Sequence, residues 1–334
     1  MFDALPATAC QTVNFLLLPC FSMQAFTSAL EPLRCANRIS GHVLYEWHVA
    51  SVDGKQVAAS NGVRLDPEGD LAALPSPGTV VICGGLGLEH YRNSELERWL
   101  RIQARSGRSL GAVCTGTLVL ARAGLLDGFR CTIHWENVEG FVEEFPRLDL
   151  TATLYEIDGL RFTCSGGTAP LDMMLYAIHH RHGESLAHQV AEQMLHAIAR
   201  LPHDTQRLPL SERTGSSHPK LLAVIARMEA FLENPVTVYD LGGAIGLSPR
   251  QLERLFRHHL ATTPKRYYLE LRLKRARLLL RQTTMPILQV AVACGFTSGS
   301  HFAQSYRAVF GYSPRAERSR PQASGTPGTR PIAA

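Results

Sequence analysis

The chain has 334 residues, 45% of them hydrophobic, and a formal net charge of +5, which is enough for two domains that each bury a full core. No stretch reaches the ~20 apolar residues that a membrane helix needs, and the N-terminus lacks the basic segment of a secretory signal, so we expect a cytoplasmic protein that does not bind membranes. The eight cysteines have no paired spacing, which favours reduced thiols, mostly in the core, and predicts neither a metal nor a cofactor.

The net charge conceals two halves of opposite sign. Residues 1–210 carry 16 Lys and Arg against 22 Asp and Glu, whereas residues 211–320 carry 17 against 7. A basic module attracts phosphate and an acidic one does not. Only the second half therefore has the charge of a nucleic-acid-binding module.

The first half alternates between apolar runs and amphipathic segments from Val13 to about His182. The runs VNFLLL, WHVASV, TVVICGG and SLGAVC predict strands buried on both faces, and residues 22–39 and 94–105 predict helices between them. This alternation is typical of an α/β domain with a doubly wound, mostly parallel sheet, which we place at residues 10–200. Ligands of such sheets bind at the carboxyl ends of the strands.

Cys114 marks the most distinctive strand end. The strand SLGAVC and the helical run TGTLVLARAGLL follow one another without a loop, so Cys114 and Thr115 are expected on a tight strand-to-helix turn. Such an elbow presents its side chain at a helix N-terminus, where partial positive charge favours a thiolate. The pair Gly84 and Gly85 ends another strand and is able to offer backbone N–H groups. A pocket-lining role and a buried structural role both remain open for Cys114.

Four segments of this half, VVICGG, GAVCTGTLVLARAGLLDG, CTIHWE and FTCSGGTAPLDMML, resemble the amidotransferase-like domain of the PfpI/ThiJ superfamily, in the form fused to AraC-type modules. Superfamily enzymes pair the elbow cysteine with a histidine and an acid. This chain has Thr115 where the hydrolases have a histidine, and PCFSMQ where they have a glutamate. The resemblance implies a pocket histidine at His134, with Glu136 near it. Because a cysteine without a dependable base is a poor catalyst, we interpret the site as a binding pocket and the chain as a non-enzyme.

The resemblance also implies the kind of ligand. Regulators of this fused type sense small nitrogen compounds, including quaternary amines such as glycine betaine and carnitine, and amino acids such as arginine. His134 and Trp135, with Phe21 and Glu31 near the end of the first strand, would supply aromatic and carboxylate groups to a cation. Core packing is the alternative for Phe21 and Trp135, and a structural role is the alternative for His134.

Three segments lie outside the two predicted domains. Residues 183–199 predict an amphipathic helix, in a region that by the resemblance helps to form a homodimer. The histidines of residues 174–200 lack paired carboxylate or cysteine partners at i, i+4 spacing, so we expect them at the surface or an interface rather than on a metal. Residues 201–219 are rich in turn formers and predict a linker. The composition of residues 319–334 predicts a disordered tail.

One unit of the C-terminal half occurs twice. Its first part, Val238 to Gly246, recurs 49 residues later as Ile287 to Gly295, and its second part, Leu252 to Pro264, recurs 50 residues later as Phe302 to Pro314. Each copy predicts a helix, a turn opened by glycine, and a second helix, which is helix-turn-helix geometry. The N-caps of the two second helices are expected at Ser248 and Ser298.

The second helix of each copy leaves polar side chains outside its apolar stripe. Arg and Gln are able to make paired hydrogen bonds with guanine and adenine edges in a major groove, whereas an ordinary solvated face is the alternative. Two copies at fixed spacing favour DNA binding. The expected DNA-facing residues are Arg250, Gln251, Arg254 and His258 in the first copy and Ser300, His301, Gln304 and Arg307 in the second.

A helix joins the copies and is expected to hold them apart as a rigid strut. Its run RLKRARLLLR is amphipathic. The predicted core positions are Leu273, Ala276, Leu279 and Leu280, and the predicted free positions are Arg272, Lys274 and Arg275.

The segments DLGGAIGLSPRQLERLF and ILQVAVACGFTSGSHFAQSYRAVFGYSP resemble the AraC/XylS family of bacterial transcription regulators over residues 220–318. By this resemblance, the two second helices enter the major groove of duplex DNA about one helical turn (~34 Å) apart. The chain is therefore predicted to be a ligand-responsive regulator, most simply an activator that works with RNA polymerase. Two rival functions stay open: an active cysteine hydrolase or amidase fused to a DNA-binding domain, and a redox sensor that uses Cys114.

Overall fold

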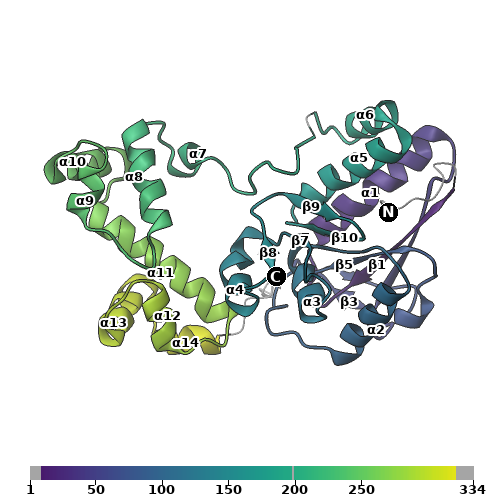
Figure 1. The fold of residues 1–334 in the computed structure, drawn as a ribbon, viewed down its shortest axis with the longest axis horizontal. Helices are drawn as coiled ribbons and strands as arrows, with labels where there is room; N and C mark the ends of the chain where they lie inside the picture. Colours follow the sequence, from purple (N-terminus) through teal and green to yellow (C-terminus); the bar gives the residue numbers. More distant parts are fainter. Residues whose placement is uncertain (1–8, 198, 321–334) are drawn as a thin grey trace, which may run out of the picture. The chain divides into compact units, whose positions relative to one another are not determined.

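The computed structural model describes residues 9–197 and 199–320. The described chain forms two compact units, the first ending at Gln206 and the second spanning Arg207–Arg320 (Figure 1). The tail expected from residue 319 onward lies outside the described residues from position 321. No helix among the described residues is both long and apolar enough to cross a membrane.

The first unit is built on a six-stranded sheet. Its strand order is β2-β1-β5-β6-β10-β9, and every neighbouring pair is parallel except β10 and β9. The predicted doubly wound, mostly parallel sheet is confirmed. The strands are β1 (Gln11–Leu17), β2 (Tyr45–Ser51), β5 (Thr79–Cys83), β6 (Leu110–Val113), β9 (Tyr155–Asp158) and β10 (Arg161–Cys164).

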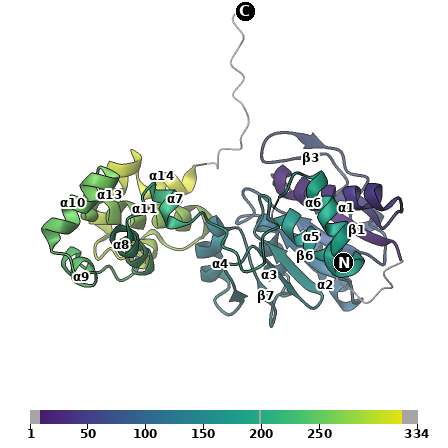
Figure 2. The same ribbon diagram turned by 90° about the horizontal axis from the view of Figure 1, so that it is seen from above.

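Helices cover both faces of this sheet because its strands are apolar on both sides. Phe15 and Val81 pack with the helices of one face, and Leu16 and Ile82 with those of the other. Figures 1 and 2 show the two layers. One layer holds α1 (Met23–Ser40), α5 (Ala169–His182) and α6 (Glu184–Gln193), and the other holds α2 (Ser94–Arg105), α3 (Thr117–Arg122) and α4 (Val138–Glu144).

Short elements complete the first unit around the sheet. They form two small two-stranded sheets and three 3-10 turns. These elements are β3 (Val57–Ala58), β4 (Arg64–Leu65), β7 (Arg130–Cys131), β8 (Asp149–Leu150), η1 (Leu71–Ala73), η2 (Cys114–Gly116) and η3 (Trp135–Asn137).

The chain after α6 folds back onto the first unit. The helix expected over 183–199 ends at Gln193, because Leu195 takes a positive φ of 53°. The buried carboxylate of Asp172 then accepts hydrogen bonds from Arg200 and contacts the ring of His196 at 2.7 Å. His196, expected at a surface or interface, therefore has a structural role.

The second unit is all-helical, as predicted, and contains both helix-turn-helix copies. Its helices are α7 (Leu210–Thr214), α8 (Pro219–Ala230), α9 (Val238–Gly243), α10 (Pro249–Leu260), α11 (Pro264–Gln282), α12 (Ile287–Ala293), α13 (Gly299–Phe310) and α14 (Pro314–Ser319). The turn glycines Gly246 and Gly295 have φ values of 67° and 74°, a conformation that favours glycine. The hydroxyls of Ser248 and Ser298 cap α10 and α13.

The connecting helix α11 belongs to the cores of both copies. Its Tyr268 packs with α8, α9 and α10, whereas Leu273 and Ala276 pack with α12 and α13. All four predicted core positions are buried. Arg272 was expected to be free, but its guanidinium donates to the carbonyls of Cys294 and Gly295 at 2.7 and 2.6 Å. It therefore ties the strut to the second turn.

Candidate functional site

The loops after four parallel strands meet at one edge of the sheet. A Cβ atom on Gly84 would lie 2.1 Å from the backbone nitrogen of Gly116, and one on Gly85 would lie 2.0 Å from the carbonyl of Cys20. One on Gly166 would lie 2.9 Å from the Cβ of Cys114. The loops approach this closely because their contact positions have no side chains.

Cys114 occupies the expected elbow, directly after β6. Its φ of 59° is rare for a residue other than glycine and is typical of a nucleophile elbow. The helix N-terminus was expected to favour a thiolate, but burial dominates at this thiol. Burial raises the pKa of the Cys114 thiol to about 11, and the interactions with Thr115 offset this only in part. The thiol is therefore protonated at neutral pH.

The neighbouring polar groups of the elbow are already paired. The hydroxyl of Thr115 donates to the carbonyl of Gly85 at 2.5 Å. The N–H of Gly84 donates to Val113 at 3.2 Å within the sheet. The N–H of Gly84 is thus not available to a ligand, contrary to expectation, because the strand pairing extends one residue past Cys83.

His134 and Trp135 lie side by side at the start of η3. Their rings are 5.7 Å apart, and the indole is 37% exposed. The Nδ1 of His134 accepts the N–H of Glu136 at 3.4 Å, and burial lowers the pKa of His134 despite the opposing charge of Glu136. The described residues contain no hydrogen bond between Cys114 and His134. The histidine is therefore neutral and does not act as a base on the thiol in this structure.

Glu136 lies within electrostatic range of the elbow. Its negative charge raises the pKa of both Cys114 and His134. The hydroxyl of Thr117, one turn after the elbow, donates to the carbonyl of Thr132 at 3.0 Å and holds the two segments together. Cys114, His134, Trp135 and Glu136 thus belong to one region of the first unit.

Phe21 and Glu31 are placed differently from this group. Phe21 is fully buried and packs edge-on against Phe26, with ring centroids 5.8 Å apart. Glu31 lies eight residues into α1, about 12 Å along the helix axis. Its carboxylate pairs with Arg34 at 2.7 Å. Glu31 is therefore not near the end of the first strand, because α1 carries it away.

Two contributions escaped sequence reasoning. The loop Ser165–Gly167 after β10 packs on Cys114, and the run FTCSGG was the available sign of another strand end. Gln206, placed in the predicted linker, donates to the carbonyls of Ile133 and Thr153 at 3.0 and 2.8 Å. No local pattern in the sequence predicts the contact of Gln206 with Ile133 and Thr153.

The second unit exposes the side chains expected to face DNA. All four named positions of α10 and all four of α13 are exposed, while Leu252, Phe256, Phe302 and Tyr306 are buried beneath them. One of them is partly engaged, because the Oε1 of Gln251 accepts the N–H of Ser248 at 2.8 Å as part of a capping box.

Comparisons with known proteins find a match for each of the two units. Residues 25–179 match the DJ-1/PfpI family, and residues 241–320 match a helix-turn-helix domain. The chain is 48% identical over 308 residues to the HTH-type transcriptional regulator GbdR of Pseudomonas aeruginosa, covering 92% of this chain and 84% of that protein. It is also 48% identical over 304 residues to the regulator CdhR of the same species, covering 91% and 90%.

Among solved structures, an AraC family transcriptional regulator from Pseudomonas putida is similar with a TM-score of 0.51 and 32% identity, over 55% of this chain and 99% of that one. The fold and these relatives define a DNA-binding transcription regulator. The chain belongs to the AraC-type helix-turn-helix regulators that carry an N-terminal DJ-1/PfpI domain.

Proposed function

We propose that this regulator responds to a small nitrogen compound, a quaternary amine or an amino acid, bound at the sheet edge near Cys114 without chemical turnover. The bound form acts as a homodimer in the cytoplasm, and it activates transcription in contact with RNA polymerase. The elbow carries the proposal: its cysteine has the geometry of a nucleophile, yet its thiol is buried and protonated.

The residues of η3 support a cationic ligand. Trp135 presents a partly exposed indole, whose face attracts an ammonium group. Glu136, in the next position, supplies a negative charge to the same region. Since burial keeps His134 neutral, no positive charge from its ring opposes a cation there.

A hydrogen-bond network supports communication with the second unit. The Nε2 of Gln206 contacts the hydroxyl of Thr132 and the carbonyls of Ile133 and Thr153 at 2.8–3.0 Å. Thr132 in turn accepts from Thr117 of α3, and Ile133 directly precedes His134. Gln206 is the last described residue of the first unit. A ligand that moves η3 therefore acts on the residue from which the chain enters the DNA-binding unit.

The elbow geometry also fits a cysteine hydrolase or a redox sensor, the two alternatives left by the sequence. Both require the thiolate, which burial disfavours. A hydrolase would show turnover that Cys114→Ala abolishes. A redox sensor would show a peroxide-dependent change in DNA affinity that the same substitution abolishes.

Calorimetric titration of the full chain with glycine betaine, carnitine and arginine tests the proposed ligand class. Saturable heat is expected with at least one compound, and Trp135→Ala and Glu136→Gln should each weaken binding about tenfold or more. Glu31→Gln is the matched control, because that carboxylate pairs with Arg34 on α1. No heat with any compound, or equal weakening by the control, would contradict the proposal.

A further inference from the structure

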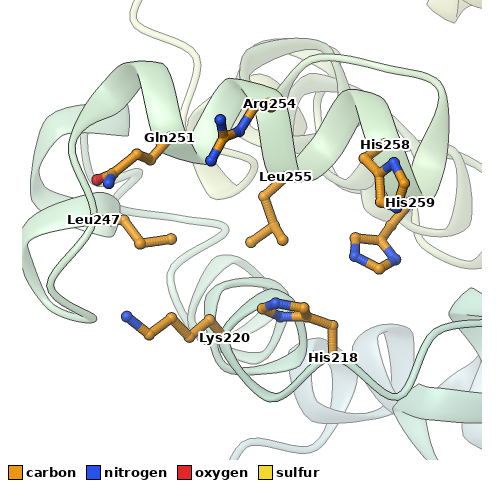
Figure 3. A pocket seen from close by; sticks show the side chains of 8 residues that line it. All are labelled: His218, Lys220, Leu247, Gln251, Arg254, Leu255, His258 and His259. Carbon is orange, nitrogen blue, oxygen red and sulfur yellow. The ribbon is translucent and has the colours of Figure 1, made fainter.

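The second unit contains a pocket of about 390 Å³ between α8 and α10, which we call the α8–α10 pocket. Figure 3 shows side chains of α10 along one side, and Lys220 and His218 at the start of α8 opposite them, with Leu255 pointing between the two helices. The lining residues are His218, Lys220, Leu247, Gln251, Arg254, Leu255, His258 and His259.

The lining has an uncompensated positive charge. It contains no acidic side chain. Lys220 and Arg254 are both exposed, and neither forms an ion pair with a carboxylate in the part of the chain that the structure describes. The two leucines add no countercharge. Two unpaired cations on facing helices make this pocket attractive to an anion.

Three imidazole rings close one end of the pocket. The centroid of the His259 ring lies 5.1 Å from that of His218 and 4.7 Å from that of His258. The Nδ1 of His218 accepts the N–H of Leu221, so its neutral ring carries hydrogen on Nε2, a donor. Within residues 9–197 and 199–320, no group of His, Cys, Asp or Glu is arranged to hold a metal ion.

The second helix-turn-helix copy shows whether the fold itself requires the basic residues of the pocket. The second copy, 50 residues later, has different residues at three of the lining positions. Arg254, His258 and His259 correspond there to Gln304, Ala308 and Val309. Both copies nevertheless form the same capped helix-turn-helix. The basic side chains that α10 contributes at these three positions are therefore not required by the fold.

We propose that the α8–α10 pocket binds a backbone phosphate of DNA, on the strand beside the major groove that α10 enters. This inference rests on DNA binding by the family to which the chain belongs. Lys220 supplies a point charge to the phosphate, and the imidazole N–H groups donate hydrogen bonds to its oxygens. A phosphate contact adds affinity without reading sequence, whereas Arg254 at the rim remains able to reach a base.

Lys220→Gln in the full chain tests this assignment by fluorescence anisotropy at several salt concentrations. The probes are a duplex selected by the wild-type protein from a randomised pool, and poly(dI-dC). Affinity should fall by the same factor for both probes, and the slope of log K against log salt should decrease by about 1. Lys220 is exposed, so the fold should be retained.

Arg266→Gln is the matched control, because Arg266 lies on α11 outside the pocket and pairs with Glu270 at 3.0 Å. It should leave the salt slope unchanged. Arg254→Ala should instead lower the specificity ratio between the probes, by about 5- to 150-fold for one good base contact. An unchanged salt slope in Lys220→Gln would overturn the assignment, and this is also the result expected if the pocket binds a free phosphorylated metabolite. A loss of affinity for the selected duplex alone would overturn it as well.

Discussion

At the scale of single residues, burial decides which polar groups are reactive and which are structural. Cys114 is a group that burial makes unreactive: its φ is that of a nucleophile elbow, but its buried thiol is protonated at neutral pH. Glu317 is a structural group. Its fully buried carboxylate pairs with Arg277 and Arg281 at 3.1 and 2.6 Å and accepts the hydroxyl of Tyr306 at 2.7 Å. One short helix, α14, is thereby fixed to α11 and α13.

The raised pKa of Cys114 predicts its chemical behaviour. Alkylation by iodoacetamide should be slow at neutral pH and should accelerate up to about pH 11, because only the thiolate reacts. The exposed thiol of Cys10 provides an internal reference and should be modified first. Mass spectrometry of peptides from the full chain measures both rates. A rate for Cys114 that levels off below pH 8 would show an activated thiolate and revive the hydrolase.

Replacing the buried acid with an amide, Glu317→Gln, should destabilise the second unit by about 1.5–3 kcal/mol per lost charged hydrogen bond, at the lower end because both arginines are partly exposed. All three tryptophans, Trp47, Trp99 and Trp135, lie in the first unit. The thermal transition followed by helical circular dichroism should therefore shift, while the transition followed by tryptophan fluorescence should not.

Glu253→Gln is the control for this substitution. It removes an exposed acid of α10 and should change the free energy of unfolding by less than about 0.5 kcal/mol.

Low pH should destabilise the second unit in the same way as Glu317→Gln. Burial opposes ionisation, but hydrogen bonds from Tyr306, Tyr312 and Arg281 hold the pKa of Glu317 below its usual value. The stabilisation is complete above the unfolded value of about 4.5 and is lost as pH falls through the lower folded value. Equal shifts in both optical signals would contradict this account.

At the scale of elements, the sequence predicted the helices, strands and turns, which depend on residues close together in the chain. The apolar runs and the repeat indicated the sheet, its helices and both helix-turn-helix copies, because burial on two faces and glycine turns leave traces in the sequence. Contacts between segments that are distant in the chain could not be predicted, because they leave no pattern in the sequence. Glu31 was separated from the strand end by the first half of α1, and Gln206 reached Thr132 and Ile133 across more than 70 residues.

Gln206→Ala should separate ligand binding from its effect on DNA. The contacts of its amide nitrogen with Thr132, Ile133 and Thr153 join the segment before His134 to the end of the first unit. Without them, ligand affinity should stay within about twofold of wild type, while the ligand-dependent change in DNA affinity should largely disappear. Gln189→Ala is the control, because the hydrogen bonds of that amide to Ser185 stay within α6. A full DNA response in Gln206→Ala would rule out this coupling.

At the scale of the whole molecule, two units of opposite charge divide the work. The basic second unit belongs to a DNA-binding family, and the acidic first unit has a DJ-1/PfpI fold in which the enzymatic elbow persists without an activated thiol. Regulation by a small molecule requires that the ligand bind the folded first unit with useful affinity. A ligand with that property must raise the free energy of unfolding of this unit.

Thermal unfolding of the full chain, followed by tryptophan fluorescence, tests this requirement most directly, since all tryptophans report on the first unit. Quaternary amines, amino acids and polyamines form the panel. We expect at least one compound to raise the transition temperature in a saturable manner. At a hundred times its Kd, the free energy of unfolding should rise by about 2.7 kcal/mol, and Trp135→Ala should reduce this gain at the same ligand concentration. If no compound moves the transition, the first unit is not the sensor that we propose.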